Sequence, residues 1–351
     1  MNVLVTGVGG PTPRSFANAL RNFGRYREAR LVATDCNRYA IGLYQKHLFA
    51  ASYLVPPANA PDYWGAIRQI VERECIDCAV VLPEIEVLEW ANREQAGTLP
   101  CKALLPPYDL ARQLVDKASM TKLLEDSGLV PRSAVISGGH AKLDQNFPLS
   151  FPFWVREAAG SCGAGALKIN NSNELSNWMA INPGVRTFLA SQYLPGRNLG
   201  CKLLYYEGRL LRAAVGERVQ YIMAKVAPSG ITGNTSFGRL LNAPEVFEVA
   251  RCAMDILFEK TNSRHHGFFT VDLKEDDHGV PKVTEVNVRH VAFTQCFAAG
   301  GANFAEDTLR LLEGDETFDR QFRLHAFEPD LIFLRDVDAL PILMKEGDLL
   351  S

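Results

Sequence analysis

Two short segments near the C-terminal end carry side chains that could bind a metal ion. Residues 269–273 (Phe-Thr-Val-Asp-Leu) and 283–289 (Val-Thr-Glu-Val-Asn-Val-Arg) alternate apolar and polar side chains, which is typical of strands with one buried face. A polar stretch ending in glycine separates them, so we expect a hairpin. If its turn centres on residues 278–279, Asp272 lies directly opposite Glu285, with Cβ atoms about 5 Å apart.

This face of the hairpin collects oxygen ligands around one point. Two facing carboxylates repel each other unless a cation lies between them. Asn287 adds a neutral oxygen on the same face, and Arg289 adds a cation. Mg²⁺ prefers oxygen ligands and completes its shell with water and substrate phosphates. The pattern therefore predicts a metal–nucleotide site, and an ordinary solvated sheet face is the alternative.

A glycine-rich segment in the middle of the chain could bind phosphate. Residues 160–165 join two strand-like stretches, and small residues there let the backbone N–H groups approach a phosphate closely. Arg156 ends the first of these strands, with Trp154 on the same face. A cation beside such a flap predicts a phosphate clamp, whereas the glycines alone favour an ordinary hairpin loop. The glycines are Gly160, Gly163 and Gly165.

The composition limits the class of protein. A chain of 351 residues is long enough for about two or three domains, and 47% hydrophobic residues can build their cores. A net charge of −3 without basic runs gives no reason to expect nucleic acid as a partner. No apolar run reaches about 18 residues, and the first residues are typical of a strand and a turn, so we expect neither a membrane span nor a secretory signal.

The eight cysteines have no framework spacing, which predicts reduced, mostly buried thiols and a cytoplasmic protein. Cys75 and Cys78 form the single close pair in the sequence. Because a second ligand pair is missing, we do not expect a zinc site there.

The elements that must position these residues fall into two groups. The first hundred residues alternate strands and helices, which predicts a three-layer α/β domain with a parallel sheet ending near Pro106. After Asp109 we expect an amphipathic helix over 110–127 and then segregated strands and helices, as in an α+β domain. The later strands are expected at 153–156, 166–169, 187–193, 201–206 and 210–214, and the later helices at 174–180, 245–260 and 304–312.

A dinucleotide site is a weaker alternative. Gly7-Val-Gly-Gly10 follows the first strand, but Thr12 interrupts the G-x-G-x-x-G pattern. Asp35 also lies further downstream than the ~20 residues expected for the acidic partner of the ribose. An NAD(P)-dependent oxidoreductase is therefore the third choice.

The order of these features resembles the ATP-grasp superfamily over essentially the whole chain. The similarity is greatest to the branch around the carbamoyl phosphate synthetase large chain and its single-unit relatives, which include carboxylate–amine ligases. Each motif is loose, but six in order over about 290 residues are fairly specific. The matching segments are 3–11, 116–124 with 128–131, 151–157, 192–197, 230–236 and 285–289.

The resemblance implies a fold and a division of the chain. Residues 1–106 would form the N-terminal α/β domain that precedes the ATP-grasp unit. Residues 107–187 would form the small subdomain with the glycine-rich flap, and residues 188–351 the C-terminal subdomain with the metal site. ATP would lie between the flap and the carboxylate-bearing sheet.

The resemblance also implies a role for each matching residue. Lys117 and Arg156 would contact the ATP phosphates, covered by the backbone of Gly160, Ser161, Gly163 and Gly165. The adenine edge would face Gln192, Tyr193 and Leu194. Mg²⁺, with Mn²⁺ as an alternative, would be held by Asp272, Glu285 and Asn287. Arg289 would meet the transferring phosphate or the acyl phosphate, so Arg289 and Arg156 are the expected catalytic residues.

The chain departs from the family pattern at the base and sugar. Two glutamates spaced seven apart usually serve the adenine amino group and the ribose hydroxyls, and here Ser191 and Asn198 take those positions. Asn198 could still bind a ribose hydroxyl, whereas Ser191 is a poorer substitute for a carboxylate. A nucleotide-binding homologue with weak or no ligase activity is therefore the second choice.

Several other positions are weaker candidates. Glu84 and Glu86 follow the third strand at the ligand-binding edge of an open sheet, where a solvated loop is expected and contact with an amino-acid ammonium is the alternative. Arg218 and His290 are candidates for the acceptor site, and His290 could instead point into the core. Cys162 in the flap and the pair His265-His266 are expected to be passive or structural.

We therefore expect an ATP-dependent ligase that activates a small carboxylic acid as an acyl phosphate and joins it to an amine, releasing ADP and phosphate. Its expected partners are these small molecules, with no nucleic acid and no membrane, and a homodimer is one expected assembly. The sequence names neither substrate.

Overall fold

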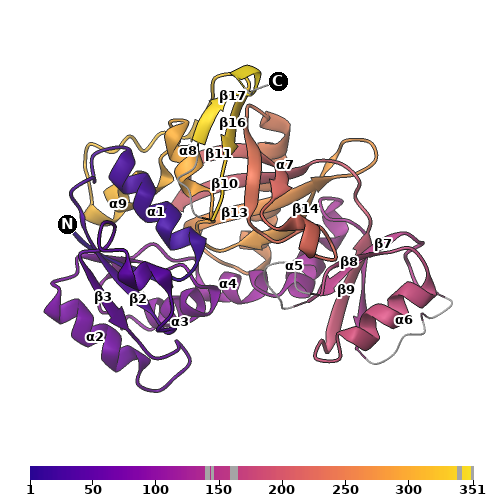
Figure 1. The fold of residues 1–351 in the computed structure, drawn as a ribbon, viewed down its shortest axis with the longest axis horizontal. Coiled ribbons are helices and arrows are strands. Elements are labelled where there is room, and N and C mark those ends of the chain that lie inside the picture. Colours follow the sequence, from indigo (N-terminus) through magenta and orange to yellow (C-terminus); the bar gives the residue numbers. More distant parts are fainter. Residues whose placement is uncertain (139–142, 144–145, 159–164, 338–341, 349–351) are drawn as a thin grey trace.

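The first of three sheets is a parallel one (Figure 1). The computed structural model describes residues 1–138, 143, 146–158, 165–337 and 342–348. The strand order is β3-β2-β1-β4-β5, with β1 Asn2–Thr6, β2 Arg30–Asp35, β3 Ala51–Leu54, β4 Cys78–Val80 and β5 Lys102–Ala103. Helices cover both faces of this sheet, which explains why its strands are apolar without alternation. The helices of this region are α1 Pro11–Asn22, α2 Tyr63–Arg73 and α3 Glu84–Gln95.

Helix α3 corrects one expectation. Glu84 and Glu86 lie in its first turn, not in a solvated loop. The helix begins directly after Pro83, and its acidic first turn suits the positive end of the helix dipole. Val87 and Trp90 bury its inner face. The hydrophobic periodicity of this helix is weak, which is why the sequence pattern did not indicate it.

The second sheet is antiparallel and small. Its order is β6-β9-β7-β8, with β6 Ser133–Ser137, β9 Thr187–Gln192, β7 Phe153–Glu157 and β8 Leu167–Ile169. Helix α6, Ser172–Ile181, packs on it and buries Leu175 and Met179 in a separate core. Strand β9 ends at Gln192, so this sheet extends beyond residue 187, where we expected the small subdomain to end.

The chain enters the second sheet through two helices, so the single helix expected over 110–127 is wrong. Helices α4, Tyr108–Leu114, and α5, Lys117–Leu124, are separated by Asp116, whose backbone is extended. The Asp116 carboxylate accepts hydrogen bonds from the N–H groups of Ala118 and Ser119 and caps α5. Lys117 therefore occupies the first position of a new helix.

The third sheet is the largest and carries the C-terminal half of the chain. Its order is β14-β13-β10-β11-β12-β16-β17, and β15 pairs with β11. The strands are β10 Asn198–Tyr206, β11 Arg209–Tyr221, β12 Thr235–Leu241, β13 Gly267–Glu275, β14 Pro281–Asn287, β15 Arg323–Leu324, β16 Leu331–Leu334 and β17 Ile342–Lys345. The helices are α7 Pro244–Lys260, α8 Thr294–Ala299 and α9 Phe304–Glu313. In the described part of the chain, no helix is both long and apolar enough to cross a membrane.

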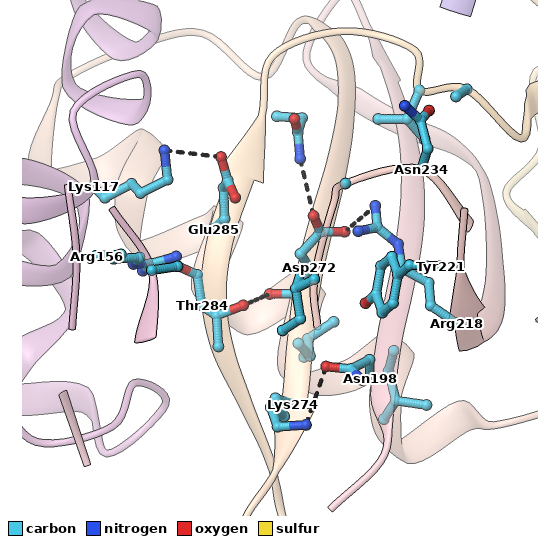
Figure 2. Close-up of a pocket in the computed structure, with 18 of the residues that line it drawn as sticks. Lys117, Arg156, Asn198, Arg218, Tyr221, Asn234, Asp272, Lys274, Thr284 and Glu285 are labelled. Atoms are coloured by element: carbon cyan, nitrogen blue, oxygen red, sulfur yellow. Dashed lines mark hydrogen bonds and ion pairs between the residues drawn. The ribbon is translucent and has the colours of Figure 1, made fainter. Parts of the chain in front are cut away.

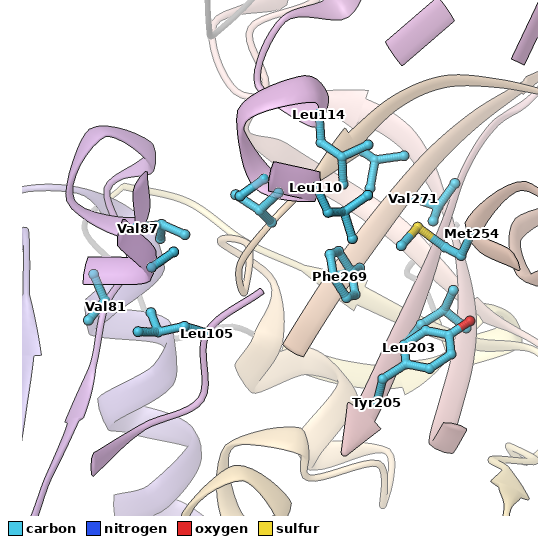
Figure 3. Packing of buried hydrophobic residues seen from close by; sticks show 14 of the residues in the cluster. Val81, Val87, Leu105, Leu110, Leu114, Leu203, Tyr205, Met254, Phe269 and Val271 are labelled. Carbon is cyan, nitrogen blue, oxygen red and sulfur yellow. The ribbon is translucent and has the colours of Figure 1, made fainter. Parts of the chain in front are cut away.

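One hydrophobic core joins the first and third sheets (Figure 3). Leu110 and Leu114 of α4 belong to the same buried cluster as Val87 of α3 and Phe269 of β13. Along β10, Leu199, Cys201 and Leu203 pack in this core against α7, so the alternate residues face the opposite side of the sheet. The shared core holds the N-terminal domain against the sheet that carries the expected metal ligands.

The expected pairing of Asp272 with Glu285 is confirmed, although the turn differs. Glu275 pairs with Pro281, so the turn centres on His278, one half-step earlier than expected. The register then shifts between Asp272 and Leu273, because Thr284 is an extra residue on β14. This β-bulge restores the pairing that simple counting predicted.

Candidate active site

A cavity of about 470 Å³ lies where the three sheets meet (Figure 2). This volume is within the range of pockets that bind small molecules. The first sheet contributes the loop after β1 and the start of α3, the second contributes β7 and the end of β9, and the third contributes β10, β11, β13 and β14. The cavity therefore depends on all three parts of the molecule.

Lys117 reaches the hairpin from the start of α5. Its backbone N–H donates to the carbonyl of Ala158, 3.0 Å away, which ties α5 to the end of β7. Its Nζ lies 3.1 Å from Oε1 of Glu285, and the Lys117 side chain is 9% exposed. The helix break at Asp116 thus aims a buried cation at one of the expected metal ligands.

Arg156 makes a second connection from β7 to the hairpin. Its Nη2 donates to the carbonyl oxygen of Thr284 at 2.5 Å. Thr284 is the extra residue of the β-bulge, which explains why its carbonyl is available outside the sheet ladder. The Thr284 hydroxyl donates to the carbonyl of Asp272 at 3.1 Å and stabilises the bulge. In Figure 2, Lys117 and Arg156 approach the hairpin from the same side.

The two carboxylates have different electrostatic environments. Burial raises the pKa of Asp272 to about 6, although Arg218 and the Asn287 amide oppose this shift. Arg218 Nη2 lies 3.0 Å from Asp272 Oδ1, and Asn287 Nδ2 donates to Oδ2 at 3.2 Å. Burial also disfavours ionisation of Glu285, but Lys117, Arg156 and Arg218 together outweigh it and lower its pKa.

These side chains fit a hard divalent cation. Among the described residues there is no group of three or more His, Cys, Asp or Glu side chains that could hold a metal ion. A cation here would instead use the carboxylates of Asp272 and Glu285 and the amide oxygen of Asn287, whose nitrogen is turned to Asp272. Asp272 Oδ1 is buried and accepts no well-aligned hydrogen bond. Oxygen ligands of this kind suit Mg²⁺ and not zinc.

Arg289 follows β14 and meets the N-terminal domain. Its Nη2 lies 3.0 Å from Oε1 of Glu84 and its Nη1 donates to the carbonyl of His290. Because Glu84 starts α3 at the carboxyl edge of the first sheet, this ion pair joins the third sheet to the first, and both residues line the cavity. The sequence made Glu84 only a weak candidate, since nothing local pairs it with Arg289.

The end of β9 and the start of β10 form another part of the cavity wall. Gln192, Tyr193 and Leu194 line the cavity, as does Ser191. The Gln192 N–H donates to the carbonyl of Arg132 at 2.8 Å, which fixes this edge to the chain before β6. Asn198 lies beside them at the start of β10.

Structural comparisons place this geometry among known folds. No protein-family model and no curated protein sequence matches the chain. An L-amino acid ligase from Bacillus licheniformis matches with a TM-score of 0.68 at 17% identity, covering 95% of this chain and 78% of that one. An N5-carboxyaminoimidazole synthetase from Staphylococcus aureus, complexed with ADP, matches with a TM-score of 0.69 at 13% identity, covering 95% and 81%. A biotin carboxylase from Campylobacter jejuni matches with a TM-score of 0.67 at 14% identity, covering 95% and 75%.

The chain has the ATP-grasp fold. Identities this low show the fold and not the activity. Over 95% of the chain, a parallel sheet is followed by two mainly antiparallel sheets, which confirms the expected α/β domain followed by an α+β domain.

Part of the expected ATP-grasp flap lies outside the described residues. Gly160, Ser161 and Gly163 belong to that part, as does Cys162. Gly165 is described and lies in the turn before β8 with φ +62°. A Cβ atom there would lie 3.2 Å from the backbone nitrogen of Glu157, so both the backbone angle and the space favour glycine.

Among the polar residues that line the cavity, Tyr221, Asn234 and Lys274 were not singled out from the sequence. Lys274 could have been found, because the alternation that puts Asp272 on the cavity face continues to it. Arg218, a weaker candidate, lines the cavity, whereas His290 is buried and stacks on Phe268 at 3.7 Å, so His290 belongs to the core.

The loop after β1 does not offer the donors that a dinucleotide pyrophosphate requires. The N–H groups of Val8, Gly9 and Gly10 donate to Thr34, to the Asp35 carboxylate and to Gly7. Proline at positions 11 and 13 removes two further N–H groups from the first turn of α1. This geometry disfavours the oxidoreductase alternative.

Proposed function

We propose that this protein is an ATP-dependent ligase that phosphorylates a small carboxylic acid and joins the resulting acyl phosphate to an amine. One observation carries the proposal: Lys117 and Arg156 contact the hairpin that carries Asp272 and Glu285, and all four side chains line a single cavity. The ATP-grasp fold supports it, and two similar solved structures are complexes with ADP or with a β,γ-ATP compound.

Phosphoryl transfer depends on positioning and charge more than on a covalent catalyst. Lys117 and Arg156 would bind the phosphates and offset their charge. Mg²⁺, held by Asp272, Glu285 and Asn287, would supply charge neutralisation at the phosphate oxygens. Among the described residues no cysteine lines the cavity, which supports a reaction without a protein nucleophile. The expected burial of most thiols is wrong for the described cysteines, because only Cys78, Cys201 and Cys296 are buried and Cys36 and Cys75 are exposed.

The two bond changes balance without another reactant. A carboxylate oxygen of the acid attacks the terminal phosphorus of ATP, and the bond to ADP breaks. The amine lone pair then attacks the acyl carbon, the C–N bond forms and the bond to phosphate breaks. The amine releases one proton, and the products are the amide, ADP and phosphate.

The acid and the amine would bind at the N-terminal side of the cavity. Arg289 would bind the carboxylate or the acyl phosphate, and Glu84 would orient Arg289 or meet the amine. The surrounding lining is small and apolar, which supports a small substrate with few charges. This lining includes Gly10, Pro11, Pro13, Leu82, Val291 and Ala292.

The proposal is tested by nucleotide binding followed by turnover. Calorimetry should detect ATP binding, and Mg²⁺ should strengthen it. ADP release should then appear when a pool of carboxylic acids is combined with a pool of amines including amino acids, but not with ATP alone. Absence of ATP binding with Mg²⁺ present would contradict the proposal.

Binding without ADP release in any pool would favour the second candidate, a nucleotide-binding homologue with weak or no activity. The presence of Ser191 and Asn198 in place of two carboxylates supports this candidate.

Two further expectations stay predictions. Limited proteolysis would test the division of the chain at residues 106 and 187, and light scattering would test the homodimer.

A further inference from the structure

A row of three polar side chains crosses the cavity face of the third sheet. Asn198 of β10 pairs directly with Arg218 of β11 on one side and with Lys274 of β13 on the other. All three line the cavity. The next row contains Gly200 and Asp272, so the three residues lie one row away from the expected metal site.

Lys274 is a cation held by neutral groups. Its Nζ donates to the carbonyl of Gly196 at 2.9 Å. It also donates to Oδ1 of Asn198 at 3.1 Å (Figure 2). No carboxylate among the described residues forms an ion pair with it. The neighbouring Glu275 is bound on the other side of the strand by Arg197, at 2.6 Å and 3.0 Å. Burial lowers the pKa of Lys274, and Glu275 opposes that shift.

This arrangement leaves hydrogen-bond donors at the cavity. An ammonium group has three N–H donors, and two of those of Lys274 are used within the protein. Asn198 accepts through its oxygen, so the donating end of its amide, Nδ2, remains. A partly buried cation without a counter-charge favours a ligand with acceptor oxygens.

The position of the row indicates which part of a nucleotide it meets. Lys274 lies two residues from Asp272 along β13, about 7 Å at the usual strand rise. Asn198 lies close in the chain to residues 192–194, where the base is expected. The row is therefore between the phosphate end and the base end of the cavity, which is the place of the sugar.

The resemblance already implies that Asn198 lies at the ribose hydroxyls; we propose that Lys274 joins it there and that the two select the sugar of the nucleotide by donating hydrogen bonds to its hydroxyl oxygens. This inference rests on the proposed ATP-dependent function. A carboxylate at position 198 would accept hydrogen bonds from the hydroxyls, whereas this pair requires their oxygen atoms as acceptors. Removing a hydroxyl leaves a buried donor unpaired, which costs more than the loss of an exposed contact.

The test compares sugars and variants in one binding experiment. Calorimetry with Mg²⁺ would measure ATP, 2′-deoxy-ATP and 3′-deoxy-ATP on the wild type, on Lys274→Leu and on Asn198→Ala. We expect at least one deoxynucleotide to bind the wild type about tenfold more weakly than ATP. In Lys274→Leu the ratio should fall to about threefold or less, chiefly because ATP binds more weakly.

Lys282→Leu is the matched control. Lys282 pairs with Lys274 across β13 and β14, but its Nζ donates to the carbonyl of Gly128 and it does not line the cavity. This variant should keep the wild-type ratio. Lys274→Gln provides a second test that retains a polar side chain, and thermal unfolding of each variant shows whether it has folded.

The outcomes separate this inference from the proposed function. Tight ATP binding with equal affinity for all three sugars would overturn the inference and leave the proposed function intact. An unchanged preference for ribose in both folded Lys274 variants would also overturn it. Failure of the wild type to bind any of the three nucleotides would overturn the proposed function itself.

Discussion

The phosphate end and the sugar end of the cavity use cations in different ways. At the phosphate end, Lys117 faces Glu285, and the guanidinium of Arg218, whose backbone lies in the row of Asn198, reaches Asp272. At the sugar end, Lys274 faces only a carbonyl and an amide oxygen. Paired charges hold one another in place before a ligand arrives, so changing one member leaves its partner buried and unpaired. The sugar end lacks such pairs, and substitutions there should change selectivity more than architecture.

The largest expected effect is at the carboxylates. Asp272→Asn and Glu285→Gln keep the side-chain shape but remove one charge each from the proposed metal site. We expect ADP release to fall about a thousandfold in each, because stabilisation of the charge on the transferring phosphate supplies much of the rate enhancement. A coupled assay with a Mg²⁺ titration measures both the rate and the metal requirement.

Asp277→Asn is the control for these variants. Asp277 lies in the turn between β13 and β14 and its side chain is 68% exposed. It should retain wild-type ADP release. Activity within tenfold of the wild type in both carboxylate variants would refute the metal assignment.

The second prediction concerns Lys202, which lies on the same face of the third sheet as Asn198 and Lys274 but does not line the cavity. Lys202 of β10 is fully buried, and its Nζ lies 4.9 to 5.6 Å from the centres of three phenylalanine rings. Burial, with a smaller contribution from Arg218, lowers the pKa of Lys202 to about 7. Three ring contacts and a hydrogen bond from Nζ to Thr294 Oγ1 at 3.4 Å favour the charge of Lys202. Because burial outweighs them and Lys202, unlike Lys274, does not line the cavity, its net charge should destabilise the fold.

The pH dependence gives the sign of this effect. The unfolded chain keeps the Lys202 proton up to pH 10.5, whereas the folded chain loses it near pH 7. The contribution of Lys202 to the free energy of unfolding therefore rises with pH between pH 7 and pH 10.5, and it is lowest below pH 7. We expect Lys202→Met to raise the free energy of unfolding at pH 6 by on the order of 3 kcal/mol, and by less at pH 9. Urea unfolding at both pH values measures this, and a destabilised variant at pH 6 would contradict it.

The parts of the fold that could be predicted from sequence were those with strong local patterns. Continuous apolar strands predicted the parallel sheet, and alternation predicted the hairpin of Asp272 and Glu285. The helix over 110–127 failed because Asp116 can either continue a helix or cap one, and contacts distant in sequence, such as the hydrogen bond from the Lys117 N–H to the carbonyl of Ala158, decide between them. Local periodicity contains no information on that choice.

Site residues could be predicted from sequence where they lie on one hairpin, but not where side chains from distant parts of the chain come together. Asp272, Glu285 and Asn287 follow from the register of a single hairpin. The pairing of Glu84 with Arg289 joins residues 205 positions apart and depends on the shared core of α3, α4 and β13. The Thr284 carbonyl is available to Arg156 because of the bulge at Thr284, and no residue type in this segment predicts a bulge.

The third prediction probes the phosphate end by affinity. Lys117→Met should weaken ATP binding about ten- to a hundredfold, because a charged hydrogen bond to phosphate is lost and Glu285 keeps an unpaired charge. Lys122→Met on the same helix is the control, since the Lys122 side chain is 74% exposed and pairs only with Glu125. Calorimetry with Mg²⁺ measures both variants. Equal affinities would place the phosphates elsewhere.

The smallest expected effect lies where the N-terminal domain meets the phosphate end. Glu84 and a substrate carboxylate would compete for Arg289, so Glu84→Gln, which retains a hydrogen-bond acceptor, should lower the KM for the acid about threefold. Steady-state kinetics on a pair of substrates found by the pooled assay measures this. If Glu84 instead binds the amine, the KM for the amine rises and that for the acid stays unchanged. The two results assign Glu84 to the acid or to the amine. They also decide whether the ion pair of Glu84 with Arg289 takes part in substrate binding, as the ion pairs at the phosphate end are proposed to do.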